Sequence, residues 1–261
     1  MLISDLDSLR SDPMIRFKEE VLDDQPLTIV HYMISNSELW DNPAAYEARG
    51  NVYNEKGECI CACFKKFFNV NERPETRVDV IKNRIVAVQE KKDGSLVAPV
   101  ISAIGRLVFK TKKSFTSDVA ILANSCAPTN VRDVSRKFIQ RGYTPLFEFT
   151  HPEAKIVLDY GNEPTFTLLA VRSFLTGDEL THSEIQDYLN EFNMNVPLIQ
   201  SYPYNWSEVK DRIENEKGIE GFVLILDDGS RVKIKTQEYL RLHRIHTEIR
   251  ERDIAESVVD E

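Results

Sequence analysis

Two Asp-Gly dipeptides constrain the fold of this chain more than any other feature of its sequence. Each lies between two short runs rich in β-branched and apolar residues, the composition expected of strands. Asp-Gly favours a tight two-residue turn, so each dipeptide predicts a β-hairpin. The predicted hairpins are residues 84–89 with 96–100 around Asp93-Gly94, and residues 222–226 with 231–235 around Asp228-Gly229.

The rest of the chain mixes further strand patterns with helical ones. Strands are predicted at residues 27–33, 59–64, 107–110, 145–149, 156–158 and 166–171. Helices are predicted at residues 118–124, 131–141, 183–192 and 207–216, and from Thr236, where Tyr239, Leu242, Ile245 and Ile249 have helical spacing. Thr181 and Glu184 form a capping-box pattern before the third helix. Hairpins interrupted by helices indicate an α+β fold with largely antiparallel sheets and flanking helices.

Length and composition are those of an ordinary globular protein. With 261 residues, of which 42% are hydrophobic and 29% charged, the chain can bury one substantial core. No repeat or linker-like stretch marks a boundary, so we expect one compact catalytic-type domain. The N-terminus carries acids and no long apolar run follows, which indicates a cytoplasmic protein without a membrane span.

The charge distribution bears on possible polyanionic partners. A formal net charge of -9 argues against a protein that holds nucleic acid by bulk electrostatics alone. Basic residues nonetheless concentrate in the middle of the chain, at Lys65, Lys66, Lys110, Lys112 and Lys113. A local basic site for a polyanion is therefore still compatible with the sequence.

Three of the four cysteines alternate along one predicted strand. Cys59, Cys61 and Cys63 have a period of two, which places them on one face of that strand. A zinc site would need a second ligand pair at finger-like spacing, and the sequence has none. We therefore interpret these residues as small buried thiols.

Lys91 lies two residues before the first Asp-Gly turn, in Lys91-Lys92-Asp93-Gly94-Ser95. Taken alone, this segment is explained as a hairpin beside a solvated lysine, and Asp227-Asp228-Gly229-Ser230 shows that such a turn needs no lysine. A lysine becomes a nucleophile only without its proton, a state that neighbouring cations or desolvation favour. Five other lysines would favour the uncharged form of Lys91, and would also bind phosphate, if they lie near it in the fold. They are Lys66, Lys110, Lys112, Lys233 and Lys235.

Lys233 and Lys235 alternate within the last predicted strand, so they share one face and can reach the same phosphate group. The alternative is that two lysines on an edge strand keep that edge soluble. Taken by themselves, the two residues favour this second interpretation.

Two carboxylates lie in similarly suggestive positions. Glu148 stands between Phe147 and Phe149 and therefore projects to the opposite face, either into solvent or into a cleft. Glu220 precedes Gly221, where backbone can approach a ligand closely, and it could orient hydrated magnesium. Alternatively, Glu220 simply begins a strand after a turn.

Five segments in this order resemble the motif series of the covalent nucleotidyltransferases, which include DNA ligases, RNA ligases and mRNA capping enzymes. They are residues 91–95, 147–149, 155–160, 220–222 and 233–235. Over about residues 28–243, the chain is most similar to the tRNA-repair RNA ligase family of T-even bacteriophages. The further matching stretches are residues 47–50, 66–72, 109–112 and 239–243, and Lys66-Phe67-Phe68-Asn69 is the most specific of them.

This resemblance implies an ATP-dependent RNA ligase that uses Mg²⁺ or Mn²⁺ and acts in three steps. Lys91 would attack the α-phosphorus of ATP, pass AMP to the 5′-phosphate of an RNA strand, and a 3′-hydroxyl would then displace AMP. The implied partners are ATP and RNA ends, such as those of a broken tRNA, with a polynucleotide kinase/phosphatase that prepares the ends. We expect a monomer in the cytoplasm, or in the host cytoplasm if the source is viral.

The resemblance also implies roles for individual residues. Lys91 would be the catalytic nucleophile, and the other residues would bind ATP or AMP. Arg49 and Lys66 would contact the outer phosphates, Glu148 the ribose, and Lys112, Lys233 and Lys235 the α-phosphate. Glu220 would act on the metal through water, Gly94 would let the backbone approach the nucleotide, and Phe68 and Tyr239 would complete the binding site.

The chain departs from the family pattern after its last lysine motif. Residues 1–235 would form the nucleotidyltransferase (adenylyltransferase) domain and residues 236–261 a C-terminal helix and tail, where the family carries a larger helical domain. Two other functions stay open: another nucleotidyltransferase of the DNA-ligase or capping type, and a non-catalytic nucleic-acid-binding module on the same scaffold.

Overall fold

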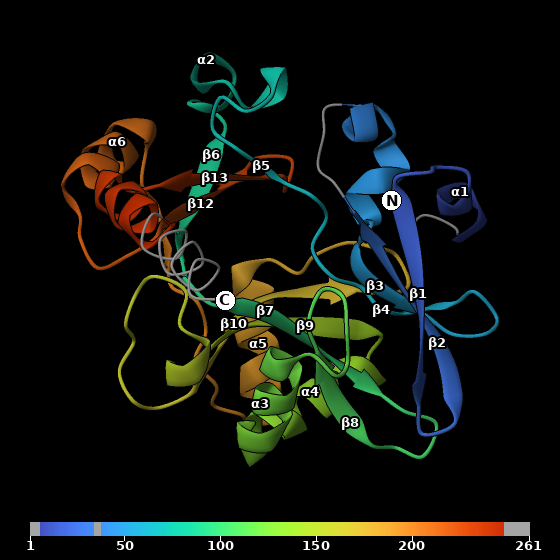
Figure 1. Cartoon of the computed structure of the whole chain (residues 1–261). Helices are drawn as coiled ribbons and strands as arrows, with labels where there is room; N and C mark the ends of the chain where they lie inside the picture. Colours follow the sequence, from blue (N-terminus) through green and yellow to red (C-terminus); the bar gives the residue numbers. More distant parts are fainter. Residues whose placement is uncertain (1–5, 34–37, 248–261) are drawn as a thin grey trace, which may run out of the picture. The chain divides into compact units, whose positions relative to one another are not determined.

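The chain forms two compact units, each assembled from segments far apart in the sequence (Figure 1). The computed structural model describes residues 6–33 and 38–247. Unit 1 comprises residues 1–66, 95–150 and 164–199, and unit 2 comprises residues 67–94, 151–163 and 200–261. Both units combine antiparallel strands with helices, so the predicted α+β class is confirmed. The domain boundary at residue 235 stays a prediction.

The first sheet of unit 1 has four antiparallel strands in sequence order. They are β1 (Ile15–Leu22), β2 (Gln25–Tyr32), β3 (Arg49–Tyr53) and β4 (Cys59–Cys61), with α1 (Leu6–Arg10) before them and the 3-10 helices η1 (Glu38–Asp41) and η2 (Pro43–Glu47) between β2 and β3. The hairpin β1–β2 turns at Asp23 and Asp24, which both have positive φ. Aspartate tolerates this conformation better than most residues, which explains a tight turn without glycine.

The second sheet of unit 1 has the order β10-β9-β7-β8. Its strands are β7 (Ser95–Ile101), β8 (Leu107–Lys110), β9 (Tyr143–Thr150) and β10 (Thr165–Ser173), and its helices are α3 (Asp118–Cys126), α4 (Thr129–Gln140) and α5 (His182–Phe192). Helix and sheet side chains share one core, in which Phe109, Phe147 and Phe166 pack edge to face or tilted. The predicted capping box is confirmed, because Thr181 and Glu184 bond reciprocally at the start of α5.

Unit 2 is built on a five-stranded sheet with the order β11-β6-β12-β13-β5. The strands are β5 (Phe68–Asn69), β6 (Ile85–Lys91), β11 (Ser201–Tyr202), β12 (Gly221–Leu226) and β13 (Arg231–Lys235); the short helical segments are η3 (Pro74–Thr76), α2 (Val78–Ile81) and η4 (Pro152–Ala154), and the longer helices are α6 (Trp206–Asn215) and residues 237–247. The second predicted hairpin is confirmed as β12–β13, with Gly229 at a φ of 78°. Ile249, predicted on the last helix, lies outside the described residues.

The first predicted hairpin, around Asp93-Gly94, is wrong. Strand β6 pairs with β11 and β12, whereas β7 pairs with β8 and β9. Gly94 does not adopt the positive φ that an Asp-Gly hairpin turn requires. The reason is tertiary: the Asp93 carboxylate accepts hydrogen bonds from residues more than 60 positions away, so it cannot form a local turn.

Two smaller predictions are also corrected. Residues 156–158 form no strand, because the backbone amides of Val157 and Leu158 donate to Asp93 instead of to a neighbouring strand. Strand β4 ends at Cys61, before the expected residue 64. Beyond it, the amides of Ala62 and Cys63 donate to the side chains of Thr144 and Asn51. Among the described residues, no helix combines the length and the apolar character that a membrane span requires.

Candidate functional site

Glu220, just before β12, lies between two lysines at the ends of the strands that flank β12 in unit 2. Its Oε2 atom is 2.5 Å from the Nζ atom of Lys91, and its Oε1 atom is 3.1 Å from the Nζ atom of Lys235. The strand register explains this meeting, because Gly221 pairs with Lys91 on β6 and with Lys235 on β13. The Glu220 side chain is buried and that of Lys91 is 24% exposed. One carboxylate thus gathers two ammonium groups in a partly sheltered position.

Gly221 permits this close approach of three strands. Its φ is +158°, and a Cβ atom at this position would lie 2.0 Å from the carbonyl oxygen of Ile234 and 2.7 Å from the Cα atom of Lys235. Both are backbone atoms, which cannot move aside independently of β13. A glycine is therefore required here by packing, in addition to any approach of a ligand.

Asp93 anchors the segment that follows Lys91. Its Oδ2 atom accepts hydrogen bonds from the backbone amides of Val157 and Leu158, and its Oδ1 atom accepts one from the Tyr239 hydroxyl at 2.7 Å. The Tyr160 hydroxyl in turn accepts a hydrogen bond from the Asp93 amide at 2.9 Å. Burial, reinforced by the bond to Asp93, raises the pKa of Tyr239, so the phenol keeps its proton and stays a donor.

Sequence reasoning assigned Asp93 only to a turn and gave Tyr160 no role. Both residues lie in segments that resemble the family motifs, residues 91–95 and 155–160. Their position in these motifs could have identified them as functional residues. The structure joins those two segments to the last helix through one carboxylate. Tyr239, a predicted binding residue, is 2% exposed and lies in the cluster with Val157 and Leu158.

The remaining predicted residues of unit 2 lie on or beside the same sheet. The Nζ atom of Lys235 is 4.7 Å from the centroid of the Tyr239 ring, and that of Lys233 is 5.7 Å from the centroid of Phe67. Phe68 is buried in β5, which pairs in parallel with β13. Because β13 lies between β12 and β5, Lys233 and Lys235 do not protect an edge strand, and the alternative interpretation of these lysines is wrong.

Unit 1 contains the other predicted residues, Arg49, Lys66, Lys112 and Glu148. Each of the two lysines lies over an aromatic ring. Lys112 Nζ is 3.4 Å from the centroid of the Tyr32 ring, and Lys66 Nζ is 5.1 Å from the centroid of the Trp40 ring. Tyr32 and Trp40 contact each other edge to face, with centroids 5.0 Å apart. The two ammonium groups are therefore held by neighbouring rings.

Burial and mutual repulsion set the electrostatics of these cations. Burial, and then the charges of Arg49 and Lys113, lower the pKa of Lys112 to about 8. Burial also lowers the pKa of Arg49, although Tyr32 and Cys63 oppose this change. A negatively charged group beside these cations would relieve their mutual repulsion.

Glu148 has the alternating environment that its sequence predicted. Phe147 and Phe149 are buried in the core of unit 1, whereas Glu148 points to the other face of β9. It lies opposite Leu96 on β7 and Thr167 on β10, in the middle of the sheet. The Glu148 side chain is 9% exposed, so that face is sheltered and not open solvent.

Two charged residues of unit 1 serve its packing. Lys110 is buried, and its ammonium donates to the carbonyl oxygens of Gly50 at 2.5 Å and Thr111 at 3.1 Å. Arg172 is fully buried and forms a bidentate ion pair with Glu47, both bonds being 2.8 Å. Carbonyl groups therefore engage the Lys110 ammonium within unit 1, and its convergence near Lys91 stays a prediction. Nothing in the sequence indicated the pair of Arg172 and Glu47.

No group of three or more His, Cys, Asp or Glu side chains is arranged to hold a metal ion in the described part of the chain. Cys61 and Cys63 are buried free thiols, as interpreted, whereas Cys59 is a free thiol that is only half-buried. Both oxygens of Glu220 contact ammonium groups. Contact of Glu220 with a metal through water fits this arrangement better than direct coordination, which would displace a lysine.

Comparison with known proteins reveals related sequences. The profile of a family described as RNA ligase matches residues 47–239. A candidate RNA ligase of Thermovibrio ammonificans is 30% identical over an alignment of 237 positions, which covers 87% of this chain and 61% of that protein. RNA ligase 1 of bacteriophage TS2126 is 29% identical over an alignment of 235 positions, which covers 85% of this chain and 58% of the phage protein. The chain thus spans about three fifths of the length of these curated relatives.

Solved structures reveal the same fold at lower sequence identity. An RNA ligase of Naegleria gruberi, determined with ATP and manganese, matches with a TM-score of 0.56 and 13% identity. The match covers 93% of this chain and 84% of that one. The chain therefore has the nucleotidyltransferase fold that is found in ATP-dependent RNA and DNA ligases.

Proposed function

Because this chain belongs to the RNA ligase family, we propose that it is an ATP-dependent RNA ligase that joins a 5′-phosphate end to a 3′-hydroxyl end. The observation that carries this proposal is the contact of Lys91 and Lys235 with the single carboxylate of Glu220. It supplies a candidate nucleophile on β6 and a phosphate-binding cation on β13, the two strands that flank β12.

The reaction begins with Lys91. As an ammonium group paired with Glu220, it has no lone pair, so it must give up a proton before it attacks. The uncharged amine forms a P–N bond to the α-phosphorus of ATP, and the bond to pyrophosphate breaks. The 5′-phosphate of RNA then takes AMP from the lysine. Finally, the 3′-hydroxyl attacks the activated phosphate, loses its proton and expels AMP.

The surrounding cations would stabilise the charge that develops on phosphate oxygens, usually a large part of catalysis. Lys233 and Lys235 share one strand, and we assign them to the α-phosphate together with Lys112. Arg49 and Lys66 are assigned to the outer phosphates and Glu148 to the ribose. Asp93 and Tyr239 hold the backbone after Lys91 and thereby position Gly94.

Magnesium or manganese would be held through water by Glu220 and directly by the phosphates of ATP. When bound, the ion would neutralise negative charge on phosphate oxygens. Contact through water would leave the pairing of Glu220 with Lys91 in place. The expected RNA substrates are broken strands, such as cleaved tRNA, after a kinase/phosphatase has prepared their ends.

Covalent labelling tests the proposed function directly. Incubation with magnesium and ATP labelled on the α-phosphate, followed by denaturing electrophoresis, should yield a labelled protein band. Lys91→Ala should abolish the label, because no other amine is expected to replace the nucleophile. Lys92→Ala is the matched control, since Lys92 is the adjacent residue but pairs with Glu90, and this variant should keep most of the label.

The label should be discharged by RNA with a 5′-phosphate, and ligated RNA should appear. Absence of label on the wild-type protein would contradict the proposal and favour the non-catalytic binding module. Labelling by GTP in place of ATP, or discharge to DNA ends alone, would indicate a capping enzyme or a DNA ligase.

A further inference from the structure

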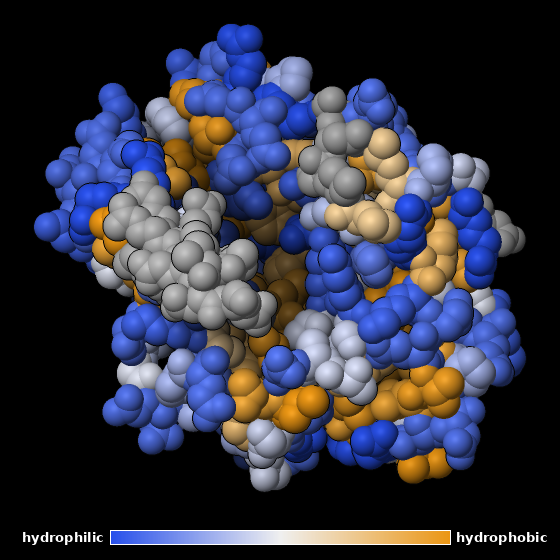
Figure 2. All heavy atoms as spheres, viewed as in Figure 1, coloured by the Kyte–Doolittle hydropathy of each residue, from blue (hydrophilic) through white to orange (hydrophobic). Residues whose placement is uncertain are grey.

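Basic side chains from three segments of unit 1 gather on one surface. Arg16 and Lys18 belong to β1, His31 to β2, and Lys112 and Lys113 to the connection between β8 and α3. We call these five residues the basic surface. Arg16, Lys18 and Lys113 are exposed, and hydrophilic residues make up most of the face seen in Figure 2.

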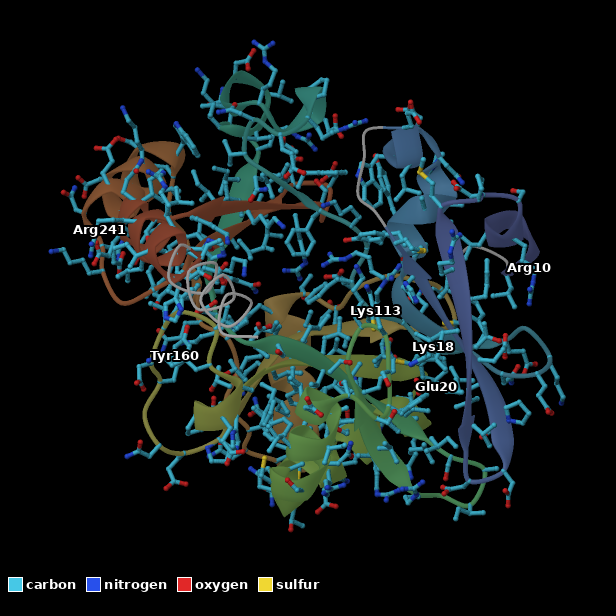
Figure 3. All side chains as sticks on the ribbon, in the orientation of Figure 1. Arg10, Lys18, Glu20, Lys113, Tyr160 and Arg241 are labelled. Carbon is cyan, nitrogen blue, oxygen red and sulfur yellow. The ribbon has the colours of Figure 1, made fainter. Side chains whose placement is uncertain are left out.

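Glu20 joins two of these segments. Its carboxylate accepts hydrogen bonds from the Ser114 hydroxyl at 2.9 Å and from the Phe115 amide at 2.8 Å, and it also pairs with Lys18. The connection that carries Lys113 is therefore fastened to β1 beside Lys18 (Figure 3). Glu20 compensates Lys18 directly, and among the contacts of this carboxylate with described residues Lys18 is the one basic side chain of the surface.

The same connection also reaches β2. Lys112 lies over the ring of Tyr32, the residue after His31, and His31 is paired with Arg16 across the hairpin. Burial lowers the pKa of His31, and the charges of Lys113, Lys112 and Lys18 lower it further. These effects confirm that positive charge converges here, in a chain whose net charge is -9.

Protection of a sheet edge is the ordinary explanation for lysines on β1, which is an edge strand. That explanation accounts for Arg16 and Lys18 but not for Lys112 and Lys113, which lie in no strand. A connection fastened by two hydrogen bonds to Glu20 adds positive charge where the edge already has it. Repulsion of this kind is tolerated most readily where an anion binds.

We propose that the basic surface binds the sugar–phosphate backbone of the single-stranded RNA whose end is joined. This inference rests on the proposed function and adds a location for the RNA strand. Lys112, assigned to the α-phosphate, stands at one side of the surface, so a strand bound there would lead to the nucleotide. Recognition would depend on charge and would be independent of base sequence.

RNA binding and its salt dependence test the proposal. We would titrate full-length protein into a 5′-phosphorylated oligouridylate carrying a fluorophore at its 3′ end, and measure anisotropy at several salt concentrations. Lys18→Gln with Lys113→Gln should weaken binding severalfold. The slope of log K against log salt should fall by about 0.7 for each lost phosphate contact on a single strand. The matched control is Lys56→Gln with Lys82→Gln, which removes two exposed lysines elsewhere.

Labelling with ATP separates this inference from the proposed function. The Lys18/Lys113 variant should accept label from ATP as the wild type does. Unchanged RNA affinity and salt slope in this variant would overturn the basic surface while leaving the ligase proposal intact. An equal loss in the Lys56/Lys82 control would overturn it too, because net charge alone would then explain the effect. A wild type that binds RNA through this surface but takes no label would contradict the ligase proposal alone.

Discussion

Lys112 changes its charge within the working pH range. Its pKa of about 8 means that the ammonium form prevails below pH 8 and is lost as the pH rises through that value. Binding of phosphate requires the charged form, so ligation by the wild type should lose this contribution above pH 8. Lys112→Arg keeps its charge throughout, because guanidinium does not titrate in this range.

The measurement is the ligation rate of both proteins between pH 7 and 9.5. Deprotonation of Lys91 affects both proteins alike, so the informative quantity is the ratio of the Lys112→Arg rate to the wild-type rate. This ratio should be flat below pH 8 and rise by up to about tenfold per pH unit above it. Parallel profiles would show that Lys112 does not bind phosphate in its charged form.

Strand β12 begins at Gly221, a position in the site where a side chain cannot fit. In Gly221→Ala, the new methyl group would meet the backbone of Ile234 and Lys235, so β13 must move away from β12. We expect the free energy of unfolding to fall by about 3 kcal/mol. Labelling by ATP should fall as well, because Glu220 and Lys235 would separate.

Gly218→Ala is the control for this experiment, measured by the same urea titration. Gly218 also has a positive φ, of 78°, but a Cβ atom there would meet no heavy atom within 4 Å. The substitution should cost only the conformational penalty of about 1 kcal/mol and leave labelling intact. Equal losses in the two variants would contradict the packing argument for Gly221.

The stability of unit 1 depends on the buried ion pair that joins its two sheets. Arg172 on β10 reaches Glu47, just before β3, and also donates to the Cys63 carbonyl oxygen. Glu47→Gln would leave the buried guanidinium uncompensated, so the free energy of unfolding should fall by about 3–5 kcal/mol in a urea titration. Glu191→Gln breaks the exposed pair with Arg141 and should cost less than about 1 kcal/mol.

The same pair predicts the response of the whole protein to acid. Burial alone would raise the pKa of Glu47, but the bonds and charge of Arg172 outweigh it and lower the pKa below the ordinary 4.5. The contribution is therefore complete above pH 4.5 and is lost as the pH falls further. Wild type should lose stability steeply below pH 4.5, whereas Glu47→Gln should lose less over the same interval. Equal acid dependence would show that other groups control it.

Local chemistry was enough for many elements. The turn at Asp228-Gly229 formed as predicted because its hydrogen bonds close within the hairpin itself. The capping box before α5 and the alternating environment of Glu148 were likewise predictable, since each depends on residues a few positions apart. The α+β class followed from the succession of such elements.

The sequence by itself therefore determined the strand and helix patterns and the set of charged residues that could serve nucleotide transfer. Tertiary structure alone decided what those residues contact. Asp93 does not form the predicted hairpin turn, because its carboxylate accepts hydrogen bonds from Leu158 and Tyr239, which are distant along the chain. Glu220 meets Lys91 and Lys235 because two strand pairings place them side by side. The physical reason is the same in both cases: hydrogen bonds and ion pairs between remote segments depend on sheet register, which no local propensity specifies.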